Sequence, residues 1–159
     1  VSSGVQAVMI YSAAYAVMNL GAFLTIDLVG EEAKSFNGLF ATRPMLAAAM
    51  AVFMAALVGI PPLSGFFGKA WVIYAGAGSG SALVYVAVAA LVVNSVLSVP
   101  YYFGIIRNMF QEEPVSAGGP AKKGDGGVAF TVYAMALLTA LFFLGVGPLA
   151  ALAVGSGLL

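Results

Sequence analysis

The sequence predicts an all-α fold: a polytopic membrane helical bundle of about four transmembrane helices, the second of them discontinuous. Three observations predict it. Of the 159 residues, 62% are hydrophobic and 8% are charged, whereas about a quarter of the residues of a soluble domain are charged. Long uncharged runs recur, each at or beyond the ~20 residues that cross a bilayer. One of these runs is too long for a single straight crossing and is interrupted by Pro61-Pro62.

The first span is predicted at residues 5–28. This run carries no charge before Asp27, where a polar loop begins. Tyr11, Tyr15 and Asn19 follow one another at intervals of four residues, so they share one face of a helix. They are candidates for lining a hydrated pathway. The alternative is that they form hydrogen bonds between helices, which stabilise membrane bundles modestly.

The second span is predicted at residues 45–77, with a break near its middle. Proline removes a backbone donor and clashes with the preceding turn, at a cost of about 3 kcal/mol inside a helix. A break of this kind either exposes backbone groups for ion chemistry or serves packing alone. We expect Ser64 to cap the helix where it restarts. The residues predicted to form the break are Gly59, Pro61, Pro62, Ser64 and Gly65.

Lys69 is the only charged residue inside an apolar run. A lysine at the bilayer centre costs roughly 2.5–3.5 kcal/mol on insertion scales. Burial disfavours the ammonium form, so a buried lysine can release and take up a proton, which arginine cannot do. The alternatives are a side chain that extends to the interface or a fixed counter-ion. We take Lys69 as the candidate catalytic residue for proton transfer, and because no carboxylate lies in an apolar run, we expect its partner to lie outside this chain.

The third and fourth spans are predicted at residues 82–106 and 128–154. Asn94, Ser98 and Tyr101 recur at near-helical spacing in the third span. Like the polar residues of the first span, they are candidates for lining a pathway or for bonding between helices.

The distribution of lysine and arginine predicts the orientation. Loops 27–44 and 107–127 hold every basic residue except Lys69. Cytoplasmic loops carry an excess of such residues, so both loops are predicted to be cytoplasmic if the second span crosses once. A re-entrant hairpin would instead divide the basic residues between the two sides, and we favour the single broken crossing.

The composition also excludes several classes of function. The chain has no cysteine, so it can form neither a disulfide nor a thiolate metal site. It has no histidine either, which argues against haem ligation and the usual zinc sites. With a net charge of zero, we expect no nucleic-acid partner. We therefore expect no cofactor and no metal in this chain. The chain begins at Val1 without a charged leader, so we expect it to be part of a longer protein.

Three segments together resemble a known family. They are Tyr11…Tyr15…Asn19-Leu20-Gly21-Ala22-Phe23, then Gly38-Leu39-Phe40…Arg43-Pro44, and then Gly59-Ile60-Pro61-Pro62-Leu63-Ser64-Gly65-Phe66-Phe67-Gly68-Lys69. The chain is similar to the C-terminal part of the antiporter-like subunits of bacterial proton-pumping NADH:quinone oxidoreductase (respiratory complex I), and to subunit N in particular. The resemblance covers essentially the whole chain in order.

The resemblance implies a partial antiporter-like membrane domain over residues 1–159, formed by the last four helices of the family fold. It implies a proton-translocating, non-redox subunit that contributes a half-channel, with Lys69 in the place of the family's protonatable lysine. Other membrane subunits of complex I, the lipid bilayer and translocated protons would be its partners, in the bacterial inner (cytoplasmic) membrane. The alternatives are a subunit of a multi-component Na⁺/H⁺ antiporter or membrane-bound hydrogenase, and a purely structural membrane spacer.

Overall fold

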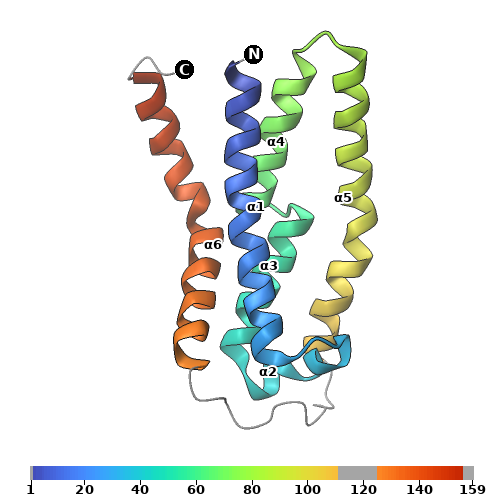
Figure 1. The fold of residues 1–159 in the computed structure, drawn as a ribbon, viewed down its shortest axis with the longest axis vertical. Helices are drawn as coiled ribbons and strands as arrows, with labels where there is room; N and C mark the ends of the chain where they lie inside the picture. Colours follow the sequence, from blue (N-terminus) through green and yellow to red (C-terminus); the bar gives the residue numbers. More distant parts are fainter. Residues whose placement is uncertain (1, 111–124, 156–159) are drawn as a thin grey trace.

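The structure, a computed structural model, describes residues 2–110 and 125–155, with side chains for residues 4–110 and 126–142. All regular elements in this part of the chain are helical, which confirms the predicted fold class (Figure 1). In chain order the elements are α1 (Ser2–Val29), a short 3₁₀ helix η1 (Ala33–Phe36), α2 (Leu39–Thr42), α3 (Pro44–Val58), α4 (Ser64–Ala77), α5 (Ala82–Met109) and α6 (Asp125–Gly155).

The second predicted span is formed by two helices in series. α3 has 15 residues and α4 has 14, so they are about 22 Å and 21 Å long at ~1.5 Å per residue. Neither alone covers a hydrocarbon core of about 30 Å. Figure 1 shows α4 continuing in the direction of α3, with the joint about half-way along the bundle. The predicted discontinuous helix is therefore confirmed, and its two halves run in one direction, as a single broken crossing requires and a re-entrant hairpin does not.

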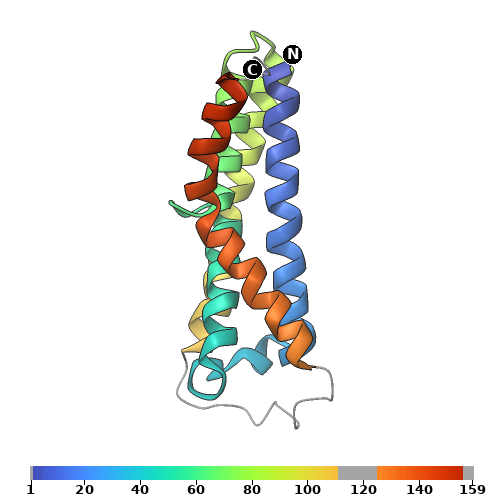
Figure 2. The same cartoon turned by 90° about the vertical axis from the view of Figure 1, so that its left-hand side faces the viewer.

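Helix ends gather at two ends of the bundle. The start of α1, the α4–α5 turn and the end of α6 lie together at one end, and η1 and α2 lie at the other (Figures 1 and 2). Most of the predicted loop 107–127 falls outside the described residues, and its cytoplasmic position stays a prediction. The same holds for the side chains of the fourth predicted span beyond residue 142, although the backbone of α6 is helical to Gly155.

Two helices in the described part are long and apolar enough to cross a membrane, at residues Gly4–Val29 and Ala82–Met109. Shorter apolar helices lie at Pro44–Val58 and Gly126–Phe142. The short length of α3 follows from the break, because Pro61 and Pro62 prevent the helix from continuing.

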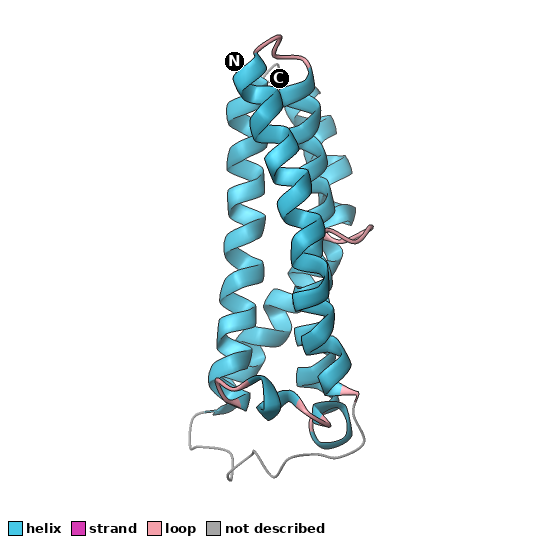
Figure 3. Cartoon of the chain, turned by 90° about the vertical axis from the view of Figure 1, so that its right-hand side faces the viewer, coloured by secondary structure: helices cyan, strands magenta, loops and turns pink. Residues whose placement is uncertain are grey.

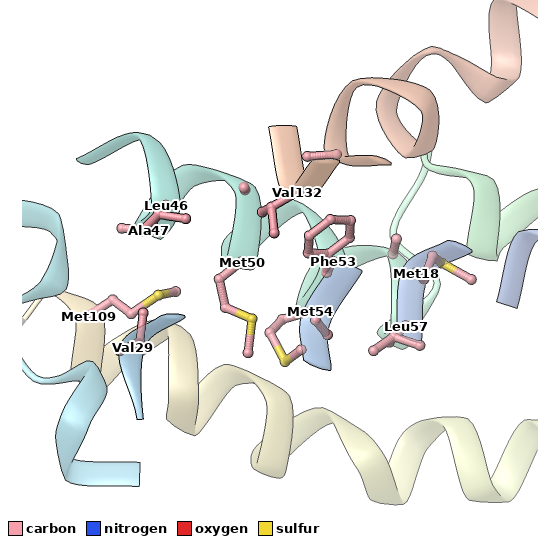
Figure 4. Close-up of a cluster of buried hydrophobic side chains, with 14 of the residues drawn as sticks. Met18, Val29, Leu46, Ala47, Met50, Phe53, Met54, Leu57, Met109 and Val132 are labelled. Atoms are coloured by element: carbon pink, nitrogen blue, oxygen red, sulfur yellow. The ribbon is translucent and has the colours of Figure 1, made fainter. Parts of the chain in front are cut away.

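The core is organised around α3. Eight of its residues are buried, and Met50 and Phe53 are completely inaccessible. Figure 4 shows side chains from α1, the end of α5 and α6 meeting those of α3 around this cluster. α3 packs against α1, α5 and α6. Since small and flexible side chains make up much of this cluster, the helices approach closely, as membrane helices do when packing drives their association.

Phe53 marks the closest approach of α1 and α3. A Cβ atom placed on Gly21 would lie 2.2 Å from Cζ of Phe53, so only glycine leaves room for the ring. One turn further along α1, the Thr25 hydroxyl donates to the Gly21 carbonyl over 2.8 Å, which satisfies this buried polar group inside its own helix.

Candidate functional site

The break between α3 and α4 leaves backbone carbonyls without helical partners. α3 ends at Val58, and Gly59 follows in the left-handed conformation, with φ 98° and ψ 42°. The N–H groups of Gly59 and Ile60 both donate to the carbonyl of Ala55, each over 3.1 Å. The last carbonyls of a helix have no partner within it. Those of Leu57 and Val58 therefore need donors from elsewhere.

Lys69 supplies these donors. Its Nζ donates to the Leu57 carbonyl over 2.8 Å and to the Val58 carbonyl over 2.9 Å. The C-terminal end of a helix carries partial negative charge, which favours a cation there, and hydrogen bonds from an ionised donor are stronger than neutral ones. Lys69 thus extends from α4 back to the end of α3 and caps it across the break.

The burial of Lys69 differs from the expectation. The side chain is half-buried and not enclosed, and it reaches the two carbonyls at the end of α3. No carboxylate among the described side chains forms an ion pair with it. In this part of the molecule, the Leu57 and Val58 carbonyls accept the hydrogen bonds of Lys69 that a carboxylate counter-ion would otherwise accept.

Ser64 does not act as the predicted cap. The capping position is Leu63, with extended backbone at φ −75° and ψ 159°, and no side chain caps the helix there. Ser64 is already the first helical residue, so its hydroxyl cannot take the position from which a capping oxygen accepts. Its Oγ is buried and has no hydrogen-bond partner among the described residues.

Two glycines hold the start of α4 against its neighbours. A Cβ atom on Gly65 would lie 1.8 Å from the carbonyl oxygen of Ala56, and one on Gly68 would lie 2.7 Å from Cδ2 of Tyr11. α4 therefore touches the backbone of α3 through Gly65 and the side chain of Tyr11 through Gly68. The sequence identified Gly65 as part of the break, but it carried no signal for the partners of either glycine.

The polar residues of α1 lie together and reach the site through Tyr11. The rings of Tyr11 and Tyr15 are 5.8 Å apart, and Nδ2 of Asn19 donates to the Tyr15 carbonyl over 2.9 Å. Tyr11 packs on Gly68, the residue before Lys69. The three residues thus follow one another along α1, with Tyr11 in contact with α4 at Gly68, and their role in lining a pathway stays a prediction.

The structure does not bring the polar residues of α5 to Lys69. Asn94 is exposed, Tyr101 is 71% exposed, and the Ser98 hydroxyl donates to the Ser95 carbonyl of its own helix over 2.7 Å. Pathway lining by these residues therefore remains a prediction that depends on residues beyond this chain.

Pro61 and Pro62 are also exposed, at the connection that projects sideways from the bundle (Figure 3). They interrupt the helix without contributing a side chain to the hydrogen bonds of Lys69. No group of three or more acidic, cysteine or histidine side chains that could hold a metal ion occurs among the described residues. The absence of a cofactor stays an expectation from the sequence.

Gly59→Ala tests the geometry of the joint. The left-handed conformation costs a non-glycine residue about 1–2 kcal/mol, and the new Cβ would lie 3.3 Å from Cδ of Lys69. We expect a lower melting temperature of the full-length protein. Gly80→Ala is the matched control, because Gly80 has φ +67° with nothing within 4 Å of the added Cβ. If the melting temperature falls no more for Gly59→Ala than for Gly80→Ala, the contact of the added Cβ with Lys69 contributes nothing.

The chain has long apolar helices around a central helix pair, α3 and α4, that is broken in the middle. Lys69 of α4 binds the end of α3 at this break. These features define a helical membrane protein with a discontinuous helix. The model of one family, NADH:quinone oxidoreductase/Mrp antiporter, transmembrane, matches residues 1–98. The chain belongs to this family.

Similar proteins agree with this membership. The chain is 99% identical over 159 residues to NADH-quinone oxidoreductase subunit N of Rubrobacter xylanophilus, covering all of this chain and 33% of that protein. It is 37% identical over 157 residues to subunit N 2 of Sorangium cellulosum, covering 92% of this chain and 30% of that protein. The chain thus spans about a third of the length of the curated relatives it matches. The predicted resemblance to subunit N is confirmed.

A solved structure shows the same fold. Respiratory complex I from Thermus thermophilus with bound aureothin contains a chain that matches with a TM-score of 0.67 and 26% sequence identity, over 86% of this chain and 32% of that one.

Proposed function

We propose that this chain is part of subunit N of a bacterial respiratory complex I and contributes a half-channel for proton translocation. Family membership and the 99% identity to a subunit N support the assignment. The other membrane subunits of that complex would be its partners, and the chain would contribute no redox cofactor. The basic loops 27–44 and 107–127 would face the cytoplasm, by the positive-inside rule.

The observation that carries the proposal is the pair of hydrogen bonds from Lys69 to the end of α3. An ammonium has three N–H donors, and a neutral amine keeps two. The Leu57 and Val58 carbonyls can therefore hold the side chain in both protonation states, while the third position exchanges the proton. Half-burial leaves one side of Lys69 open for that exchange.

The charge of Lys69 also links proton transfer to the joint. Loss of the proton converts two charge-assisted hydrogen bonds into neutral ones, which are weaker by about half. It also removes the cation that offsets the negative end of α3. Proton release would thus loosen the connection between α3 and α4, and proton uptake would restore it.

Lys69→Met in the intact complex tests this function. Methionine keeps a long apolar stem but has no proton to exchange, so we expect the number of protons pumped per NADH oxidised to fall. Lys34→Met is the matched control, since Lys34 is exposed in η1, and it should leave the ratio unchanged. Full pumping by Lys69→Met would refute the proposed role and would favour a structural spacer.

The family description supplies one competing function, because it names Mrp antiporters alongside NADH:quinone oxidoreductase. An antiporter subunit would use the same joint for Na⁺/H⁺ exchange. The genes beside the full-length gene discriminate between the two. Neighbouring quinone oxidoreductase subunits favour the first function, and neighbouring antiporter subunits favour the second.

A further inference from the structure

A cavity of about 340 Å³ lies where three helices end, away from the break. It is formed by the last turn of α1 and the first turns of α3 and α6, at the end of the bundle that carries η1 and α2 (Figure 1). Its volume falls within the range of small-molecule sites, ~300–1,000 Å³. The wall is mostly apolar, and the lining includes Leu28, Arg43, Pro44, Met45, Gly126 and Tyr133.

Arg43 gives this cavity a positive charge. Its Nη1 donates to the Leu28 carbonyl over 3.2 Å, so the guanidinium caps the end of α1 and is held in place. No carboxylate among the described side chains pairs with it. A guanidinium has five N–H donors in a planar fork that matches a phosphate. After the bond to Leu28, the other donors have no hydrogen-bond partner among the described residues and can bind a ligand.

The cavity lies at one end of the apolar helices and would be at the interface of a membrane that they span. The ends of three apolar helices meet there, which is the level at which a bilayer changes from hydrocarbon to headgroups. Phe40 and Phe110 stack at the same end with ring centroids 5.0 Å apart, and both are exposed. Met45, at the cavity, is 64% exposed. An anionic group beside apolar surface at this level is the chemistry of a phospholipid.

We propose that this cavity binds the headgroup of an anionic phospholipid. The phosphate lies on the guanidinium of Arg43, and an acyl chain begins against the exposed side chain of Met45 at the first turn of α3. This site is separate from Lys69 and independent of the proposed function, because it requires only that the chain spans a membrane. A single basic residue near an anionic surface is worth about 1 kcal/mol, which corresponds to a preference of about fivefold over a zwitterionic lipid.

Quenching by brominated lipids measures this preference at the cavity. Ala129 lines the cavity, and this chain has no cysteine, so Ala129→Cys gives this part of the full-length subunit one thiol for a bimane label. The complex without the substitution, treated with the same reagent, gives the background to subtract. The complex is reconstituted into vesicles of phosphatidylcholine with increasing brominated phosphatidylglycerol or, separately, brominated phosphatidylcholine. We expect about fivefold stronger binding of the phosphatidylglycerol. Equal quenching by the two lipids would overturn the proposal, and so would no quenching by either, since a protein segment would then fill the cavity.

Matched variants assign the preference to Arg43. Arg43→Gln should abolish it, and Arg43→Lys, which keeps the charge and the cap, should retain most of it. Arg107→Gln removes an exposed cation from the end of α5, outside the cavity, and should change nothing. An equal loss in Arg107→Gln would show only a general surface charge. Inorganic phosphate is added in a further arm. If it abolishes the quenching difference, the site binds free phosphate and the lipid proposal fails.

Discussion

Replacing Gly65 with alanine is expected to destabilise the protein by about 3 kcal/mol, the upper part of the usual range for overpacking. The added Cβ would lie 1.8 Å from the carbonyl oxygen of Ala56. That oxygen belongs to the backbone of α3 and cannot rotate away as a flexible side chain would. α4 must therefore move off α3, and the hydrogen bonds from Lys69 to Leu57 and Val58 lengthen with it. The measurement is the melting temperature and the assembled amount of the full-length protein in its complex.

Gly104→Ala is the control for this change. Gly104 lies inside α5, and a Cβ atom added there meets nothing within 4 Å. Alanine is favoured over glycine inside a helix by about 1 kcal/mol, so this variant should be as stable as the natural protein or more stable. Equal behaviour of the two variants would show that α4 does not approach Ala56 as closely as the structure has it.

Phe53→Ala is expected to cost about 3–5 kcal/mol, as large-to-small changes of a buried aromatic do. Phe53 is completely inaccessible, and its ring covers Gly21 of α1. Removing the ring leaves a cavity between α1 and α3 that neither helix can close. Packing supplies much of the stability of membrane helix bundles, so the loss should appear in the melting temperature of the full-length protein.

Phe130→Ala is the matched control, because Phe130 lies on α6 with 73% of its surface exposed. Its removal should change stability by less than about 0.5 kcal/mol. A similar loss at both positions would mean that residues outside this chain cover Phe130, or that Phe53 is not the contact that holds α1 to α3.

The location of the site followed directly from the sequence. Proline chemistry placed the break within Gly59–Gly65, and the structure has it between Val58 and Ser64. The spacing of Tyr11, Tyr15 and Asn19 predicted a shared face, and Tyr11 and Tyr15 are in ring contact. In the sequence, Arg43 is one of the basic residues of loop 27–44. The structure shows it capping the end of α1, a role for which nothing local in the sequence gave a signal.

The partners of Lys69 show the same limit more clearly. The break predicted that backbone carbonyls would lose their helical partners. It did not predict that Lys69, twelve residues after Leu57 and eleven after Val58, would donate to them. Ser64 has the residue type of a cap, yet the helix starts one residue too early for it to serve as one. Both results depend on how the turn at residues 59–63 directs α4, which no short window of sequence specifies.

By itself the sequence determined the class of fold, the broken second crossing and the position of the one charge within it. These are set by hydrophobicity, by the missing N–H of proline and by the cost of an ion in hydrocarbon, which act over a few residues. Only the tertiary structure decided which carbonyls Lys69 binds, how far its side chain is buried and which helix Gly65 contacts. Those depend on the packing of α4 against α1 and α3, where glycines admit close contact and a flexible side chain reaches whichever carbonyls the joint presents.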